Sequence, residues 1–118
     1  FEIIGYNQTR SFNYIDDAVG GTISCLEAEG VNNEIFHLGS RQEISIEDLV
    51  KYIGQILKYG GKFTFKDAPS GSVKRRCPDI TKAKEVLGYE PEVDWKDGVL
   101  RTVTWYRDFY SSGGIPFE

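Results

Sequence analysis

The sequence predicts an α/β chain of the α+β kind, a small lobe with about three short strands and four helices. Three observations point to this class. Helical patterns with polar N-terminal caps alternate with short β-prone runs, which is typical of mixed architectures. The chain has only 118 residues, and 40% of them are hydrophobic. That size suits one domain and leaves no room for two independent cores, so we expect residues 1–118 to form a single domain.

The first strand and the first helix are predicted within residues 1–30. The run FEII at residues 1–4 reads as a strand. Asp17 is a suitable N-cap for a helix that reaches about Glu29, and Gly30 supplies a stop. Gly20-Gly21 weakens this helix by about 1 kcal/mol per glycine relative to alanine, so packing must stabilise it. Its apolar positions at helical spacing are Val19, Ile23, Cys25 and Leu26.

The middle of the chain predicts a second strand, the clearest helix and a third strand. Residues 34–39 (EIFHLG) form a strand-like run. Ser45, with Asp48 three positions later, resembles a capping box at the start of an amphipathic helix that ends in the YGG of residues 59–61. Residues 62–65 (KFTF) then read as a strand.

A long connection and two further helices complete the chain. Residues 66–78 have no predicted structure of their own, and loops of that length in a compact domain are often functional. Asp79 or Thr81 caps a short helix that Gly88 closes. Asp94 caps the last helix, one side of which carries Val99, Val103, Tyr106 and Tyr110.

Composition excludes several classes of function. The formal net charge of −4 repels nucleic acid and anionic membranes, so any phosphate site must come from a local basic cluster. Cys25 and Cys77 stand far apart without ligand partners, which indicates neither a metal site nor a disulfide and favours a reducing, cytoplasmic setting. No apolar run or leader pattern indicates a membrane span or a secretory signal.

Two basic clusters are candidate anion sites. Strand-like alternation places Arg10 on the same side as Phe12 and Tyr14, so its guanidinium would lie along two rings and offer a planar fork to phosphate oxygens. The alternative is an arginine packed on aromatics and paired with Asp16 or Asp17. The second cluster is Lys74-Arg75-Arg76, which is otherwise a solvated basic turn. If the fold brings the clusters together, they make a diphosphate clamp.

Self-contained catalytic machinery is missing. His37 is the only histidine and has no nucleophile or ligand partner nearby, which is typical of a structural residue. There is no glycine-rich strand-to-helix turn, no Walker loop, no CxxC and no tyrosine followed four residues later by lysine. The chain also lacks methionine and opens within a strand-like run, so we expect it to start inside a longer protein.

Three runs resemble the C-terminal region of the extended short-chain dehydrogenase/reductase family, which comprises NAD-dependent nucleotide-sugar epimerases, dehydratases and decarboxylases. They are QTRSFNYIDDAVGG, FHLGS with ISIEDLVKYI, and RRCPDITKAKEVLGYEPEVDWKDGVLRTVTWY. They occur in the expected order over residues 1 to about 110. The sequence departs from the family in reading Gly5-Tyr6-Asn7 before the first run, and in carrying His37 where many members have asparagine.

The resemblance implies a substrate-binding lobe that closes over a preceding Rossmann domain. Arg10 and Arg76, or less surely Arg75, would contact the diphosphate of a nucleotide sugar, with His37 and Gln8 as further substrate-binding residues. The catalytic residues and the NAD site would lie in the missing domain, so the chain alone would be inactive, and the parent enzyme would be a homodimer. The rival interpretations are a free-standing, non-catalytic interaction module and a small nucleotide-binding domain that uses the two arginine clusters alone.

Overall fold

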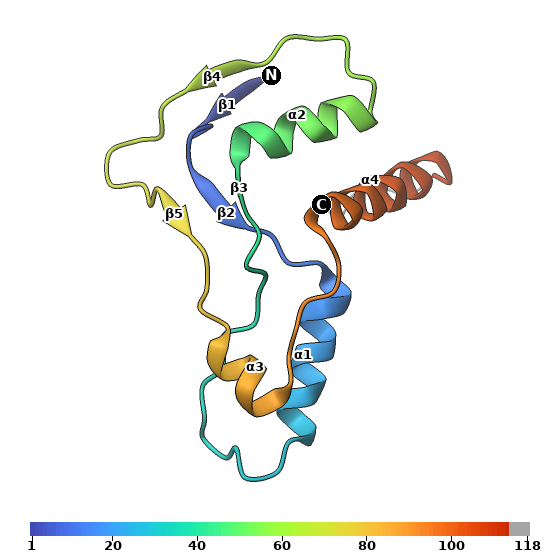
Figure 1. Ribbon diagram of the computed structural model, residues 1–118. Coiled ribbons are helices and arrows are strands. Elements are labelled where there is room, and N and C mark those ends of the chain that lie inside the picture. Colours follow the sequence, from blue (N-terminus) through green and yellow to red (C-terminus); the bar gives the residue numbers. More distant parts are fainter. Residues whose placement is uncertain (114–118) are drawn as a thin grey trace.

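The computed structural model describes residues 1–113, which form four helices and five short strands (Figure 1). The predicted class and the four helices are confirmed, with five strands in place of about three. The strands are β1 (Glu2–Ile4), β2 (Thr9–Ser11), β3 (Glu43–Ser45), β4 (Thr64–Lys66) and β5 (Arg75–Arg76). The helices are α1 (Ile15–Glu27), α2 (Ile46–Ile56), α3 (Thr81–Leu87) and α4 (Trp95–Ser111).

The strands make two small sheets. β1 pairs in parallel with β4, and β2 lies between antiparallel β3 and parallel β5. The central position of β2 is what matters for function, because it brings residues from three distant parts of the sequence side by side. In Figure 1 this sheet lies between an upper part, made of β1, β4 and α2, and a lower part, made of α1 and α3.

The strand predicted over residues 34–39 is not formed. A strand exists only through its ladder partner, and no other strand of the described residues lies beside this segment. Its backbone is held by side chains instead: Lys82 Nζ donates to the Ile35 carbonyl at 3.1 Å and the Tyr89 hydroxyl to that of Gly39 at 3.2 Å. The observed strand comes later, as β3, which leads directly into α2.

Two of the predicted helix starts are confirmed and one is wrong. The Ser45 hydroxyl accepts the Asp48 amide at 3.0 Å and Asp94 Oδ1 accepts the Lys96 amide at 2.9 Å, as N-caps do. Asp17, in contrast, lies inside the first turn of α1, because the helix begins at Ile15 with Tyr14 as its N-cap. The Asp17 carboxylate is used elsewhere, accepting two backbone amides from the segment before α4, at Glu92 and Val93.

The short helix α3 and the end of α2 also differ in detail from expectation. Asp79 Oδ1 accepts the Thr81 amide at 2.9 Å, although Ile80 is the N-cap, and left-handed Gly88 closes the helix as predicted. α2 ends at Ile56, ahead of the YGG run, and the left-handed residue there is Lys58, with φ of 50°.

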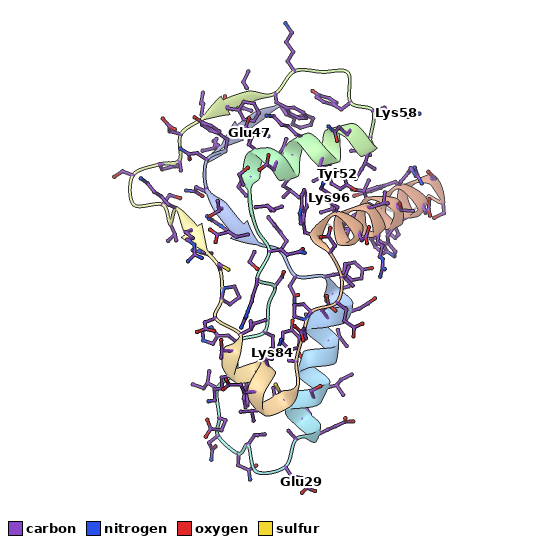
Figure 2. The ribbon with its side chains drawn as sticks, viewed as in Figure 1. Glu29, Glu47, Tyr52, Lys58, Lys84 and Lys96 are labelled. Atoms are coloured by element: carbon purple, nitrogen blue, oxygen red, sulfur yellow. The ribbon has the colours of Figure 1, made fainter. Side chains whose placement is uncertain are left out.

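The buried apolar core is small and lies where α1 meets α3. Its fully packed members are Ile80, Ala83 and Tyr89. Gly21 permits the contact, because a Cβ at this position would lie 2.7 Å from the Tyr89 ring. A second contact joins α2 to α4, where the rings of Tyr52 and Trp95 meet edge to face at 5.3 Å; Figure 2 shows Tyr52 and Lys96 at this junction.

Much apolar surface stays uncovered. The chain exposes 8634 Å², whereas a compact protein of 13.4 kDa exposes about 6,500 Å². Its radius of gyration is 17.2 Å, against about 13.5 Å for a compact chain of this length. One exposed set follows a single stripe of α1, and we call it the α1 stripe: Ile15, Val19, Ile23 and Leu26. Among the described residues, no helix combines the length and the apolar character needed to cross a membrane.

Candidate functional site

An open pocket of about 940 Å³ lies beside β2 and β5. Both arginine clusters reach it, together with His37, which contributes from the extended segment before β3. The structure thus brings together four of the five residues expected to bind substrate. The full lining is Arg10, Ser11, His37, Arg75, Arg76, Cys77, Pro78, Asp79 and Lys82.

Strand register places Arg10 and Arg76 beside each other. β2 and β5 run parallel, with Thr9 opposite Arg75 and Arg10 opposite Arg76. Side chains on paired strands at opposed positions project to the same face, so the two guanidinium groups share one side of the sheet. No carboxylate within residues 1–113 forms an ion pair with either of them. Two adjacent cations of this kind suit an anion with two phosphates.

The Arg10 side chain also fastens the loop that leads into β5. Its Nη1 donates to the carbonyls of Thr9 and Lys74, at 2.7 and 3.4 Å, and its Nη2 donates to Val73 at 3.0 Å and to Gln8 Oε1 at 2.7 Å. These bonds hold the guanidinium in one orientation and use most of its terminal donors. Nε–H is the donor that makes no hydrogen bond within the described residues.

Gln8 is placed behind the pocket and does not line it. The residue is only 7% exposed. Its Nε2 donates to the Ser72 hydroxyl at 2.7 Å, while its Oε1 accepts from Arg10. The side-chain amide therefore links the residue before β2 to the loop before β5 and orients Arg10, whereas the resemblance implied a contact with the ligand.

Arg75 is held by a carboxylate, unlike its neighbour Arg76. Its Nε lies 2.9 and 2.8 Å from the two oxygens of Glu43, and its Nη2 lies 2.8 Å from Oε2. Glu43 also accepts a hydrogen bond from the Thr9 hydroxyl. The Thr9 bond and then the Arg75 bond lower the pKa of Glu43, so the carboxylate is charged wherever the chain works near neutral pH.

The remaining charged groups of the pocket are tied to α3 and its surroundings. Lys82 is paired with Glu34 at 2.6 Å and lies 4.9 Å from the centre of the Phe36 ring. The hydrogen bonds from the side chain and then the backbone of Thr81 lower the pKa of Asp79. Cys77 is a free thiol at the pocket wall.

The predicted stacking of Arg10 on Phe12 and Tyr14 is wrong. β2 ends at Ser11, so strand alternation does not extend to these rings. They line a separate apolar pocket of about 250 Å³ against α2 and α4. Tyr14 does meet a guanidinium, but it is that of Arg101, 5.3 Å from the ring centre. The alternative pairing of Arg10 with Asp16 or Asp17 is also absent from the described residues.

Glu43 is the residue of this region that sequence reasoning missed. It lies in the run SRQEIS, after the strand predicted at residues 34–39, where the observed strand is only three residues long. The available signal was that Glu43 stands two positions before the capping Ser45. A short strand would place both side chains on the same face. Nothing local in the sequence identifies Arg75 as its partner.

The described residues fit neither a metal nor a dinucleotide. Within residues 1–113, no three His, Cys, Asp or Glu side chains come together as metal ligands. β3 runs directly into α2, and Phe12, Asn13 and Tyr14 connect β2 to α1, so neither turn has the glycines that a pyrophosphate needs at a helix start. Neither of these two turns therefore has the dinucleotide-binding pattern.

Several known proteins similar to this chain are nucleotide-sugar enzymes, although no family model matches it. A UDP-N-acetyl-alpha-D-glucosaminuronate decarboxylase from Bacillus cytotoxicus is 37% identical over 107 residues, which cover 86% of this chain and 33% of the relative. A UDP-glucuronate 4-epimerase from Thermodesulfobacterium geofontis is 35% identical over 102 residues, covering 86% of this chain and 31% of the relative. The chain thus spans about a third of the length of these relatives.

A solved structure shares the fold closely. The UDP-glucuronic acid 4-epimerase of Bacillus cereus, in complex with UDP-glucuronic acid and NAD, superposes with a TM-score of 0.83 at 31% identity, over 92% of this chain and 35% of that chain. The homologues of this chain are nucleotide-sugar enzymes of the extended short-chain dehydrogenase/reductase family, and several of their solved structures contain NAD. The family portion that it matches is the C-terminal part.

Proposed function

We propose that this chain is the substrate-binding part of an NAD-dependent nucleotide-sugar epimerase, dehydratase or decarboxylase. In this proposal Arg10 and Arg76 hold the diphosphate. The observation that carries it is the register of β2 and β5, which sets the two arginines side by side at an open pocket. Neither has a carboxylate partner among residues 1–113, so the positive charge of both is available to an anion.

The two arginines contribute differently to binding. Arg76 is exposed at the pocket and makes no side-chain hydrogen bond within the described residues, so its whole planar fork is free for phosphate oxygens. Arg10 presents its charge and its Nε–H, while its terminal nitrogens keep the loop at Val73 and Lys74 in place. The fixed orientation of Arg10 lowers the entropy cost of binding.

Redox chemistry lies outside this chain in the proposal. A transient oxidation of a sugar hydroxyl needs a nicotinamide and a base, and the described residues offer neither a dinucleotide turn nor a tyrosine–lysine pair four residues apart. The role of residues 1–118 is then to bind and orient the nucleotide sugar. UDP-sugars are the first substrates to test, because the related decarboxylase and epimerases are named for them.

Binding of UDP by the protein at its native length tests this proposal. Isothermal titration should show that Arg10→Ala and Arg76→Ala each weaken UDP affinity by about 10- to 150-fold, the equivalent of about 1.5 to 3 kcal/mol for a hydrogen bond to a charged group. Arg107→Ala is the matched control, since Arg107 is an exposed arginine on α4 away from the pocket. Unchanged UDP affinity in both pocket variants would remove the assignment.

We also propose that a Rossmann domain covers the α1 stripe and the edge of residues 34–40. The stripe is apolar and bare, with Leu26 81% exposed. Next along the chain, Phe36, His37 and Leu38 make no backbone hydrogen bond with the described residues. Parallel sheets are built from βαβ units, in which a helix leads into a strand that pairs with a neighbouring strand. α1 and the extended segment after it, with its free backbone groups, match the helix and the second strand of such a unit.

Hydrogen exchange distinguishes this arrangement from a free-standing module. In the native protein, the amides of residues 36–38 should exchange slowly, because a neighbouring strand would bond them. Fast exchange at all three amides, with protection retained in α2 as an internal reference, would favour the free-standing interaction module.

A further inference from the structure

The pocket side of the three-stranded sheet and its reverse side carry arginines in different states. On one side, Arg10 and Arg76 face the pocket. On the reverse side, Glu43 on β3 reaches across β2 and holds Arg75 through three contacts of 2.8 to 2.9 Å. Thr9 on β2 completes this reverse-side cluster through its hydroxyl. Two nitrogens of the Arg75 guanidinium bond to Glu43, and Thr9 bonds to the same carboxylate. The geometry of this ion pair is therefore better defined than that of a usual surface ion pair.

Some of the cations that line the pocket are paired with carboxylates of the described residues and others are not. Of the cations that line it, Arg75 is neutralised by Glu43 and Lys82 by Glu34. Among residues 1–113 the two lining arginines without a carboxylate partner are Arg10 and Arg76. Their combined charge of about +2 matches the two ionised phosphates of a nucleoside diphosphate sugar, each of which carries about one negative charge.

Arg75 is nevertheless close enough to matter to a ligand. It lines the same pocket as Arg76, and its side chain is 67% exposed, so no packing prevents it from turning. What restrains it is the Glu43 carboxylate, which is only 24% exposed and is fixed from the other side by Thr9. Without that carboxylate, the Arg75 guanidinium would be free to turn and would add a third unpaired cation at the pocket rim.

We propose that Glu43 is a specificity-determining residue: by holding Arg75 away from the ligand, it restricts the site to the Arg10–Arg76 pair and selects two phosphates over three. The inference rests on the proposed diphosphate site. It adds that the carboxylate on the reverse side of the sheet sets how much positive charge the pocket presents. Glu43 acts through Arg75 and does not touch the ligand.

The test compares UDP and UTP binding in the protein at its native length. Isothermal titrations with UMP, UDP and UTP are run on the unmodified protein and on Glu43→Gln. The amide keeps the size of the side chain and removes its charge. We expect the UTP-to-UDP affinity ratio to rise by about threefold to fivefold in Glu43→Gln, the size of one partly exposed charge contact.

Two further variants separate selectivity from damage to the fold. Glu47→Gln removes a carboxylate from the 2.6 Å pair with Lys51 on α2, where Figure 2 labels Glu47, and it should leave the ratio unchanged. Adding Arg75→Gln to Glu43→Gln removes the released cation and should return the ratio to its original value. If Glu43→Gln does not fold, Arg75→Lys replaces it, since a lysine keeps the charge but loses the two-point bond, and the ratio should again rise.

The outcomes distinguish the two proposals. A UTP-to-UDP ratio that does not change in folded Glu43→Gln, while Arg10→Ala still weakens UDP binding, overturns the role of Glu43 and leaves the diphosphate site standing. UDP binding that is insensitive to both Arg10 and Arg76 overturns both. A ratio that rises equally in Glu47→Gln shows a general effect of net charge and also overturns the role of Glu43.

Discussion

Two neighbouring regions differ in how far their side chains find partners within the described residues. They are the sheet of β2, β3 and β5, and helix α1. In the sheet, polar side chains find partners inside the chain: Gln8 bonds to the loop before β5, and Arg75 bonds to Glu43. On α1, one face packs through Gly21 on Tyr89, while the residues of the apolar stripe on another face stay 46 to 81% exposed among residues 1–113.

The difference shows which part of the molecule is complete by itself. Hydrogen bonds among the described residues fix Arg10 and Arg75, whereas Arg76 makes no side-chain hydrogen bond there. The bare α1 stripe leaves apolar surface in water, which is unfavourable by about 25 cal/mol per Å² and is typical of a surface that another domain covers. The pocket is therefore expected to be preformed, whereas the stability of the helical part is expected to depend on what lies against α1.

The largest expected effect comes from a charge on the α1 stripe. In the native protein, Ile23→Glu should lower the free energy of unfolding by about 3 kcal/mol, because a covered carboxylate loses its hydration and the isoleucine contact is lost as well. Denaturant unfolding measures it. Gln55→Glu, at an exposed position of α2, is the control and should change little. Equal, small effects would mean that the stripe remains in water.

Replacing either of two adjacent glycines of α1 by alanine should have the next largest effect on stability, with opposite signs. Gly21→Ala should destabilise by about 2 kcal/mol, because its Cβ would lie 2.7 Å from the Tyr89 ring. Gly20→Ala should stabilise by about 0.5 to 1 kcal/mol, since no atom lies within 4 Å of the added methyl and alanine is the better helix former. Thermal unfolding of both variants checks this. Destabilisation by Gly20→Ala would place a covering surface against that position too.

Removing the Tyr89 hydroxyl, which links the segment after β2 to the helical part, should have a smaller effect on stability. The Tyr89 hydroxyl donates to the Gly39 carbonyl at 3.2 Å and accepts from Asn13 Nδ2 at 3.1 Å, just after β2. Tyr89→Phe should therefore cost about 1 kcal/mol of unfolding free energy. Tyr106→Phe is the matched control on α4, where the hydroxyl makes no hydrogen bond with the described residues. Equal losses of unfolding free energy in both variants would contradict a specific role of the Tyr89 hydrogen bonds.

Acid should weaken both regions through their ion pairs. Hydrogen bonds from Thr9 and Arg75 lower the pKa of Glu43, and those from Lys82 and Lys84 lower the pKa of Glu34 and Glu90. A lowered carboxylate pKa contributes stability that is present above the ordinary value of 4.5 and is lost as the pH falls through the lower, folded-state value. Stability measured from pH 6 to 3 should fall below about pH 4.5, and less steeply in Glu43→Gln. An unchanged slope in that variant would show that the Glu43 contact contributes nothing.

Local sequence signals predicted the helices well, but not the strands. Ser45 and Asp94 mark the starts of α2 and α4 correctly, because a cap is a contact between residues two or three positions apart. The strand expected at residues 34–39 failed for the opposite reason, since its partner is not among the described residues. β5 contains two residues and has no pattern of its own.

The candidate site was predictable only in part. The two arginine clusters and His37 were identified from the sequence and the family resemblance, and the fold does bring them to one pocket. The positions of Gln8 behind Arg10, and of Phe12 and Tyr14 in another pocket, could not be read from alternation, because β2 stops at Ser11.

By itself, the sequence determined the class of fold, the caps of α2 and α4, and the basic residues available to bind an anion, because these depend on near neighbours and on composition. The tertiary structure alone decided that Arg76 stands beside Arg10, that Glu43 takes Arg75, and that the α1 stripe stays bare. Each of these depends on a partner tens of residues away, or on the absence of one. Pairing at that range is set by strand register and helix packing, which no local pattern encodes.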